Sequence, residues 1–346
     1  MSDSLQATLV FDWFRNLDGD RGILRRNINW VFHYFSGSRT FSNELTELTS
    51  LLDGASEIMH ASGLADTHHS WARVYEDLDD WPRLKQFFLD GCGKNDVLVG
   101  FELSPAQRSL ISSVGKTYLD IRTHPVRFLP DYMLAANTNS TEIHDRLVKL
   151  TPERSYIDQY VGFVKARAAR RYTKRMNTDH GIVFFSQIAV DSSRIRGGEI
   201  IDDFFVISEL VKILDKYKPK NFYVKHHPHE KIKQNTMEML RELNAKEINT
   251  NTYDLLSCDG LLCAALSSSV CHEAQYFKTR PHIFLEPIEN FSPIGTTSKV
   301  GDYMMLPSNI YSADLWRFLL EGGETPRSEF PRFETPYRSA SGLSWG

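Results

Sequence analysis

The second half of the chain alternates short apolar runs with longer segments of helical spacing. The apolar runs cover 181–187, 222–224, 260–266 and 281–285, and the segments of helical spacing cover 202–217, 237–243, 254–256 and 267–277. Continuous apolar runs of this length are typical of strands buried on both faces of a parallel sheet, and the helical segments supply the crossovers between them. The alternation therefore predicts an α/β, doubly wound domain in this half.

The first half shows the same pattern less regularly. Strands are expected at 7–14, 96–105 and 117–125, and helices at 23–35, 43–59, 71–89, 141–150 and 155–170. The last two of these strands end in polar residues and Pro, as expected where parallel strands enter a binding cleft. We predict two Rossmann-like domains that face a central cleft. The predicted boundaries are 1–175 for the N-terminal domain, 176–325 for the C-terminal domain and 326–346 for a tail.

Composition narrows the class of protein. The 346 residues are 41% hydrophobic and 24% charged, and their net charge of −4 argues against a surface that coats nucleic acid. No apolar run reaches the length of a membrane span, and residues 1–6 lack the basic and apolar regions of a signal peptide. The four cysteines form no CxxC pair. These observations predict a cytoplasmic protein with free thiols.

A cluster of basic and imidazole side chains follows one predicted strand. The strand at 222–224 is followed by Lys225, His226, His227 and Pro228, and Pro cannot donate a hydrogen bond to a neighbouring strand. Ligands collect at such strand ends in open α/β sheets. The cluster is either a solvated polar loop or an anion site, and the neighbouring strand ends bear on this choice.

Two further strand ends bring polar groups to the same edge of the sheet. One carries Gln187, Asp191, Ser193, Arg194 and Arg196, and the other carries Ser267, Ser268 and Ser269 at the start of a helix. Helix N-termini bind phosphate, and Lys225 and His227 would add charge-assisted donors. Glu273 lies one turn after Ser269, where a carboxylate can accept the hydroxyls of a ribose. The alternatives are an N-cap role for Ser268 and a capping-box role for Glu273, but the three loops together favour a nucleotide site.

The spacing of the histidine, acidic and basic residues gives weaker support for a metal site or a nucleic-acid site. His226 and His227 point to opposite faces of a strand and cannot easily chelate one ion. The acidic stretches 17–20 and 77–80 are more typical of a turn and of a solvated helix face than of a metal site. The basic run 165–175 could follow nucleic acid or an anionic membrane surface, but it also fits a solvated helix and linker. We therefore expect no metal, no cofactor and no nucleic-acid partner.

Three short motifs resemble one enzyme family. They are Gln187-x-x-x-Asp191-Ser-Ser-x-Ile-Arg196, Lys225-x-His227-Pro228 and Ser268-Ser269-x-x-x-Glu273-Ala274, in that order within 181–285. The chain thereby resembles the bacterial β-Kdo transferases of capsule, lipopolysaccharide and O-antigen biosynthesis, which use CMP-Kdo and have a GT-B fold. The Lys-x-His-Pro and Ser-Ser elements are also similar to those of bacterial sialyltransferases that use CMP-sialic acid. The first half matches loosely, through 100–105 and 123–125.

The resemblance implies a role for each motif. The residues assigned to substrate binding are Gln187, Ser193, Arg194, Arg196, Lys225, His226, Ser267, Ser268, Ser269 and Glu273. Kdo transfer with retention would use Asp191 as nucleophile, His227 at the leaving group and Glu102 from the facing domain as general base. An Asx-turn to Ser193 is the alternative for Asp191. Since the family often has Pro or another residue where this chain has His226, either imidazole could face the phosphate.

The expected substrates are a CMP-Kdo donor and a polysaccharide or glycolipid-linked glycan acceptor, with the acceptor on the side of the N-terminal domain. By resemblance, the protein would work in the cytoplasm, peripherally on the inner face of the cytoplasmic membrane, beside other polysaccharide-assembly transferases. An inverting CMP-sialic acid-dependent sialyltransferase is the closest competing function. A non-catalytic carbohydrate- or nucleotide-binding protein is the alternative from another class.

Overall fold

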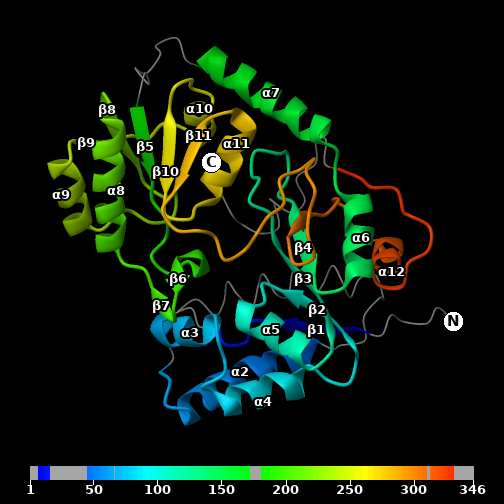
Figure 1. The fold of residues 1–346 in the computed structure, drawn as a ribbon. Helices are drawn as coiled ribbons and strands as arrows, with labels where there is room; N and C mark the ends of the chain where they lie inside the picture. The colour runs from blue at the N-terminus through cyan, green and yellow to red at the C-terminus, as the bar shows by residue number, and fades with distance from the viewer. Residues whose placement is uncertain (1–6, 16–44, 66, 172–180, 310–311, 331–346) are drawn as a thin grey trace.

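The computed structural model describes residues 7–15, 45–65, 67–171, 181–309 and 312–330. The helix predicted at 23–35, the turn at 17–20, the end of the basic run and most of the predicted tail lie outside these ranges. The described chain forms two α/β units, each built on a five-stranded sheet (Figure 1).

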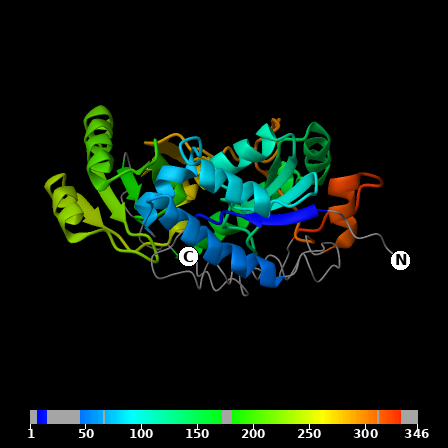
Figure 2. The same cartoon turned by 90° about the horizontal axis from the view of Figure 1, so that it is seen from below.

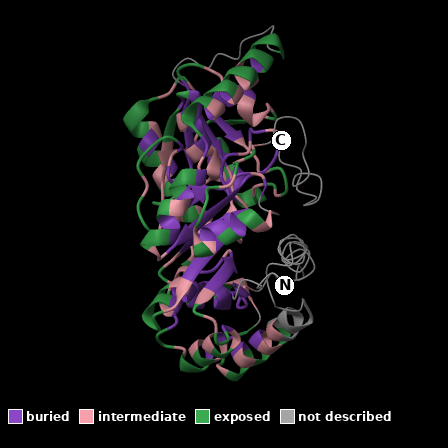
Figure 3. Ribbon diagram, turned by 90° about the vertical axis from the view of Figure 1, so that its right-hand side faces the viewer, coloured by how far each residue is buried: buried purple, intermediate pink, exposed green. Residues whose placement is uncertain are grey.

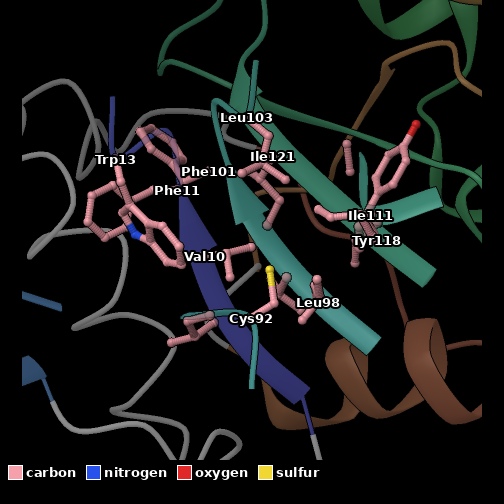
Figure 4. Packing of buried hydrophobic residues seen from close by; sticks show 14 of the residues in the cluster. Val10, Phe11, Trp13, Cys92, Leu98, Phe101, Leu103, Ile111, Tyr118 and Ile121 are labelled. Carbon is pink, nitrogen blue, oxygen red and sulfur yellow. The ribbon is translucent and has the colours of Figure 1, made fainter. Parts of the chain in front are cut away.

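The first unit contains a mixed sheet with the strand order β1-β2-β3-β4-β12. Its strands are β1 (Ala7–Phe11), β2 (Val97–Phe101), β3 (Thr117–Thr123), β4 (Leu134–Thr138) and β12 (Met304–Met305). β1, β2 and β3 are parallel, whereas β4 runs antiparallel to β3 and to β12. Its helices are α2 (Leu45–Ala61), α3 (His68–Tyr75), α4 (Pro82–Gly91), α5 (Pro105–Ser113), α6 (Thr141–Leu150) and α12 (Ala313–Glu321). Apolar side chains of the strands, among them Val10 and Leu98, pack with Trp13 and Cys92 in one core (Figure 4).

The second unit contains an all-parallel sheet with the order β11-β10-β5-β8-β9. Its strands are β5 (Gly181–Phe185), β8 (Asn221–Lys225), β9 (Ala245–Glu247), β10 (Leu262–Ala265) and β11 (Arg280–Ile283). Its helices are α7 (Arg154–Arg171), α8 (Asp203–Tyr217), α9 (Gln234–Glu242), α10 (Thr252–Leu256) and α11 (Ser269–Phe277). Figure 2 shows α8 and α9 at one end of the molecule and α12 at the other. The strand order reverses between β5 and β10, which is where ligands bind in Rossmann sheets.

The architecture confirms the prediction of an α/β chain with two Rossmann-like units. Burial explains why the second sheet was predictable: β5 and β10 are buried along their whole length, so their sequences are continuously apolar (Figure 3). The helix α5 was not predicted, although Ser104 and Gln107 form a capping box ahead of it and Pro105 occupies its first turn.

The single helix predicted at 71–89 is wrong. The chain forms α3 and α4 instead, because Pro82 has no N–H to continue an earlier helix and is suited to starting a new one. The acidic stretch 77–80 therefore lies in the turn between them, where the Asp79 N–H donates to Asp77 Oδ1 at 2.7 Å. The same stretch had been expected on a helix face.

The two units exchange segments, so the predicted domain 176–325 is divided between them. β12 pairs with β4 of the first sheet, and Arg146 Nη1 of α6 donates to the Leu319 carbonyl of α12 at 2.9 Å. In the other direction, Phe128 and Ile157 belong to the core of the second unit. Apolar segments pack wherever a core accepts them, and a local pattern does not reveal which core that is.

Candidate functional site

The carboxyl ends of β5 and β10 are joined by a hydrogen-bond network at the point where the strand order reverses. Gln187 Nε2 donates to Ser193 Oγ at 3.0 Å and to Ser267 Oγ at 3.3 Å. Ser267 N donates to Gln187 Oε1 at 2.8 Å, and Ser267 Oγ donates to the Ser193 carbonyl at 2.9 Å. The structure thus brings these three predicted residues together. Because they bond to one another, their contribution here is to hold the loop after β5 in place.

His226 and His227 point in different directions at the end of β8. His226 Nε2 lies 3.0 Å from Glu247 Oε2, and its Nδ1 accepts a hydrogen bond from the Ile232 N–H at 3.2 Å. These contacts hold His226 toward β9 and the segment before α9. His226 is thus engaged by protein groups, and His227 is the imidazole on the side of the loop after β5. Which of the two binds substrate stays a prediction.

His227 lies against that loop. Its N–H donates to Ser186 Oγ at 2.8 Å, and its Nδ1 accepts from the His229 N–H at 3.2 Å, which assigns the proton of the neutral ring to Nε2. Burial lowers the pKa of His227, and the charge of His229 lowers it further, whereas Asp191 and Glu230 raise it. His227 is therefore a neutral Nε2–H donor near neutral pH, within electrostatic reach of the Asp191 carboxylate.

Lys225 is a half-buried cation at the last position of β8. Burial lowers the pKa of its ammonium group, and within the described ranges no carboxylate forms an ion pair with Nζ. β5 lies between β8 and β10, so the ends of these strands form a row about 10 Å wide. A partly desolvated cation without a counter-ion in such a row is suited to binding an anion.

The N-terminus of α11 faces the same edge. Ser268 is its N-cap, and the Ser268 hydroxyl accepts from the Val270 N–H at 3.3 Å. Ser269 occupies the first helical position, and both serines are half-buried. The first N–H groups of the helix and its dipole favour an anion here. Ser268 therefore serves as the N-cap that the alternative interpretation predicts. The N-terminus of α11 remains suited to binding phosphate.

Asp191 forms an Asx-turn to Ser193, which is the predicted alternative to its role as nucleophile. Its Oδ1 accepts from the Ser193 N–H at 2.9 Å and caps a short 3-10 turn, Ser192–Arg194. The side chain is half-buried, and no described residue donates a hydrogen bond to its Oδ2. The turn fixes one carboxylate oxygen and leaves the other available for chemistry.

The two arginines of this loop are held by protein groups. Arg194 is buried, with Nη2 donating to the Ile201 carbonyl at 2.7 Å and to Asp203 Oδ1 at 3.0 Å. These bonds close the hairpin of β6 (Ile195–Arg196) and β7 (Glu199–Ile200), so the predicted substrate-binding role of Arg194 is corrected. Arg196 donates to the backbone carbonyl of Glu286, and burial lowers its pKa.

Glu273 is buried in the second unit, against the segment that follows β3. Its Oε1 accepts from the Arg127 N–H at 2.6 Å and from the Tyr253 hydroxyl at 3.3 Å, and the residue is 2% exposed. Burial raises the pKa of Glu273 to about 7, against the opposing effect of these hydrogen bonds. The carboxylate is engaged with the segment after β3, so the predicted contacts with a ribose are corrected. A capping-box role is excluded as well, because Glu273 lies beyond the first turn of α11.

Glu273→Gln is expected to remove part of the pH dependence of stability. From its ordinary pKa of 4.5 up to about 7, the folded chain keeps a proton on Glu273 that the unfolded chain loses, so the free energy of unfolding falls as pH rises. The variant does not titrate and keeps an oxygen acceptor. Urea unfolding at about pH 5 and about pH 8 should show wild type losing up to about 3 kcal/mol more than the variant. Equal losses would contradict this assignment.

Glu102 lies directly after β2 in a strained conformation. Its φ of 53° is in the left-handed region, which is uncommon for a residue other than Gly. Its carboxylate pairs with Arg15, whose guanidinium lies 5.5 Å from the centroid of the Trp71 ring. Such strain persists only where surroundings impose it, and it is frequent at functional sites. Glu102 thus lies at the carboxyl end of the first sheet, but among the described residues no hydrogen bond or ion pair joins it to Asp191.

A buried charge cluster was missed by the sequence analysis. It consists of Arg108, Asp120, Arg122, Glu289 and Tyr303. Glu289 lies in the segment after β11, and its two oxygens are 2.7 Å from Arg108 Nη2 and 3.2 Å from Arg122 Nη1. Asp120 is fully buried in β3 and accepts from the Tyr303 hydroxyl. A carboxylate inside the apolar strand was the available signal, because a buried Asp requires partners.

Two broader properties concern the described ranges only. No helix there combines the length and the apolar character needed to cross a membrane. No three or more His, Cys, Asp or Glu side chains come together there in a group that could hold a metal ion. The expectation of a site without metal or cofactor stays a prediction.

Comparisons with known proteins give structural similarities only. No protein-family model and no curated protein matches the chain. The structure is similar to Thermosulfurimonas dismutans KpsC, beta Kdo 2,7 transferase, with 12% identity and a TM-score of 0.37 over 85% of this chain and 84% of that one. For the beta Kdo 2,4 transferase of the same KpsC, the identity is 13% and the TM-score 0.34, over 59% and 73% of the chains. The structure is also similar to UDP-GlcNAc 2-epimerase from Neisseria meningitidis bound to UDP-GlcNAc. Here the identity is 9% and the TM-score 0.28, over 80% of this chain and 81% of that one.

The family that the motifs resemble is thus present among the similar solved structures. The assignment of the fold does not depend on these similarities. It depends on the order and direction of the strands in the two sheets.

Proposed function

We propose that the chain is a GT-B glycosyltransferase that moves Kdo from CMP-β-Kdo to a glycan acceptor, with retention of configuration. The observation that supports this best is the placement of Asp191. Its carboxylate has one oxygen held by the Ser193 N–H and lies within electrostatic reach of His227, on the sheet edge that also carries Lys225. A nucleophile beside an anion site is what transfer from a sugar phosphate requires.

The donor phosphate would bind across the ends of β8, β5 and β10. Lys225 supplies a half-buried ammonium, and His227 supplies an Nε2–H donor. Ser268 and Ser269 supply hydroxyls at the N-terminus of α11. Charge-assisted hydrogen bonds of this kind stabilise the phosphate of the ground state and, more strongly, the charge that develops as CMP departs.

The proposed chemistry is a double displacement. Asp191 Oδ2 attacks the anomeric carbon of Kdo, the bond from that carbon to the phosphate oxygen breaks, and CMP leaves with the electron pair. The acceptor hydroxyl then attacks the glycosyl-enzyme, gives its proton to a general base and releases the Asp191 carboxylate. Two inversions amount to retention, and no step requires a metal. We assign the general base to Glu102, whose carboxylate is held by Arg15 here.

We propose a glycan carried on a polysaccharide or glycolipid, bound on the side of the first unit. Such an acceptor would bring the protein to the inner face of the cytoplasmic membrane and beside other transferases of the same assembly.

His227→Ala is expected to weaken CMP binding by about 10-fold to 150-fold, because a hydrogen bond to a charged group contributes about 1.5–3 kcal/mol. Isothermal titration calorimetry with CMP measures the change. His226→Ala is the matched control, since the neighbouring imidazole is engaged with Glu247 and the variant should bind CMP as wild type does. Equal affinity in the His227 variant and wild type would remove the anion site from the proposal.

A further inference from the structure

Helix α7 carries a row of aromatic side chains that are in contact with one another. The ring centroids of Tyr156 and Tyr160 lie 5.1 Å apart, and those of Tyr160 and Phe163 lie 5.8 Å apart. Phe330 extends the row at its other end, with its ring centroid 5.2 Å from that of Tyr156. Tyr156, Tyr160 and Phe330 pack partly against the core of the second unit, whereas the Phe163 residue is 58% exposed. The row therefore runs from the core out to the surface.

The core does not account for the place of Phe163 on this helix. The buried residues of α7 are Ile157, Val161 and Ala168, whose spacing puts them on one stripe of the helix. α7 contacts α10 and α11, and Figure 1 shows it along the outer edge of the second unit. Phe163 lies outside the buried stripe, so its ring faces away from the helices against which α7 packs.

Two exposed arginines share the face of Phe163. Arg167 and Arg170 follow it by four and seven residues, which is the spacing of one helix face. Both are exposed, and among the described residues no carboxylate forms an ion pair with either guanidinium group. An exposed aromatic ring thus lies beside two cations without counter-ions.

The remaining charges of α7 do not cancel these two. Asp158 is engaged by Arg154 at 2.8 Å, and residues 159–171 contain no Asp or Glu. Arg171 Nη1 lies 3.5 Å from Asp254 Oδ2, and Lys165 Nζ donates to the Phe277 carbonyl at 2.9 Å. The chain as a whole has a net charge of −4, so this positive surface is local.

We propose that the α7 face, formed by Tyr160, Phe163, Arg167 and Arg170, docks on an anionic lipid surface. Aromatic side chains are favoured at the level of the lipid headgroups, and arginines are attracted by anionic headgroups. Nucleic acid is the weaker candidate, because the overall negative charge of the chain would repel it. The proposal rests on the proposed function in one respect, since a glycolipid-linked acceptor would be presented at such a surface.

Co-sedimentation with lipid vesicles tests this docking. Wild type should bind vesicles of phosphatidylcholine mixed with phosphatidylglycerol, should bind pure phosphatidylcholine vesicles far more weakly, and should be released as salt is raised. Arg167→Gln together with Arg170→Gln should weaken binding to the mixed vesicles by about 25-fold, since each charge contributes about fivefold. Phe163→Ala should weaken this binding by about 10-fold, because its exposed ring leaves water on docking.

Helix α8 supplies the matched controls. Phe204→Ala removes a residue that is 68% exposed, and Lys212→Gln together with Lys216→Gln removes two positive charges from exposed positions. Both controls should bind the mixed vesicles as wild type does. Circular dichroism should show the wild-type fold in every variant, because surface substitutions change stability by no more than about 0.5 kcal/mol.

Three results would overturn the docking role. They are equal binding of wild type to both kinds of vesicle, binding to neither, and α7 variants that bind as tightly as the α8 controls. Wild type that binds a single-stranded oligonucleotide in place of the mixed vesicles would assign the α7 face to nucleic acid and overturn the proposal as well. These measurements need no CMP-Kdo, so their failure leaves the proposed function standing. Wild type that binds the mixed vesicles but releases no CMP from CMP-Kdo would overturn the proposed function and leave the docking role intact.

Discussion

Asp191→Asn is expected to abolish transfer from CMP-Kdo, with kcat reduced by at least about 1000-fold, while CMP binds with unchanged affinity. The amide oxygen can still accept the hydrogen bond from the Ser193 N–H, so the 3-10 turn should form as before. An amide oxygen is a far poorer nucleophile than a carboxylate oxygen, and only the covalent step should suffer. Release of CMP measures turnover, and calorimetry measures binding.

Asp202→Asn is the matched control for this result. Asp202 also caps a helix, since its Oδ1 accepts from the Phe205 N–H at 3.0 Å at the start of α8. Asn is an equally good N-cap, so this variant should keep wild-type turnover. If Asp191→Asn retained turnover, the Asp191 carboxylate would have a structural role in the turn and no catalytic role.

Glu289→Gln is expected to cause the largest loss of stability, about 3–5 kcal/mol in the free energy of unfolding. The Glu289 side chain is 13% exposed, and its negative charge balances the charges of Arg108 and Arg122, whose side chains are each 11% exposed. The amide nearly preserves shape but removes the charge, which leaves the two buried guanidinium groups with Asp120 as their remaining counter-ion among the described residues. Urea unfolding monitored by circular dichroism gives the difference.

Two further variants test whether the loss arises from charge. Glu324→Gln removes a carboxylate from an exposed position and should change stability by no more than about 0.5 kcal/mol. Arg108→Met together with Glu289→Gln removes one charge of each sign and should recover part of the loss. A Glu289→Gln protein as stable as wild type would show that the cluster contributes no net stability.

The second sheet was more predictable than the first because its strands are buried and its connections are local. β5 and β10 are continuously apolar, and each is followed by its own helix. β9, in contrast, is an edge strand that reads Ala-Lys-Glu and carries no apolar signal. β12 is two residues long and pairs with β4, so only tertiary structure defines it.

The candidate site was predicted in outline, and individual roles changed where distant partners decide them. The sequence indicates that Gln187 and Ser267 lie at neighbouring strand ends, and they are hydrogen-bonded. It gives no sign that Arg194 closes a hairpin or that Glu273 is buried against the segment that follows β3.

The most direct test of the proposed mechanism is intact-mass spectrometry of the wild-type chain after brief incubation with CMP-Kdo, and separately with CMP-sialic acid. With CMP-Kdo, we expect a covalent adduct of one Kdo residue, located on Asp191 by peptide mapping and absent from Asp191→Asn. No adduct is expected with CMP-sialic acid. CMP release and transfer without any adduct, or an adduct that persists in Asp191→Asn, would contradict it.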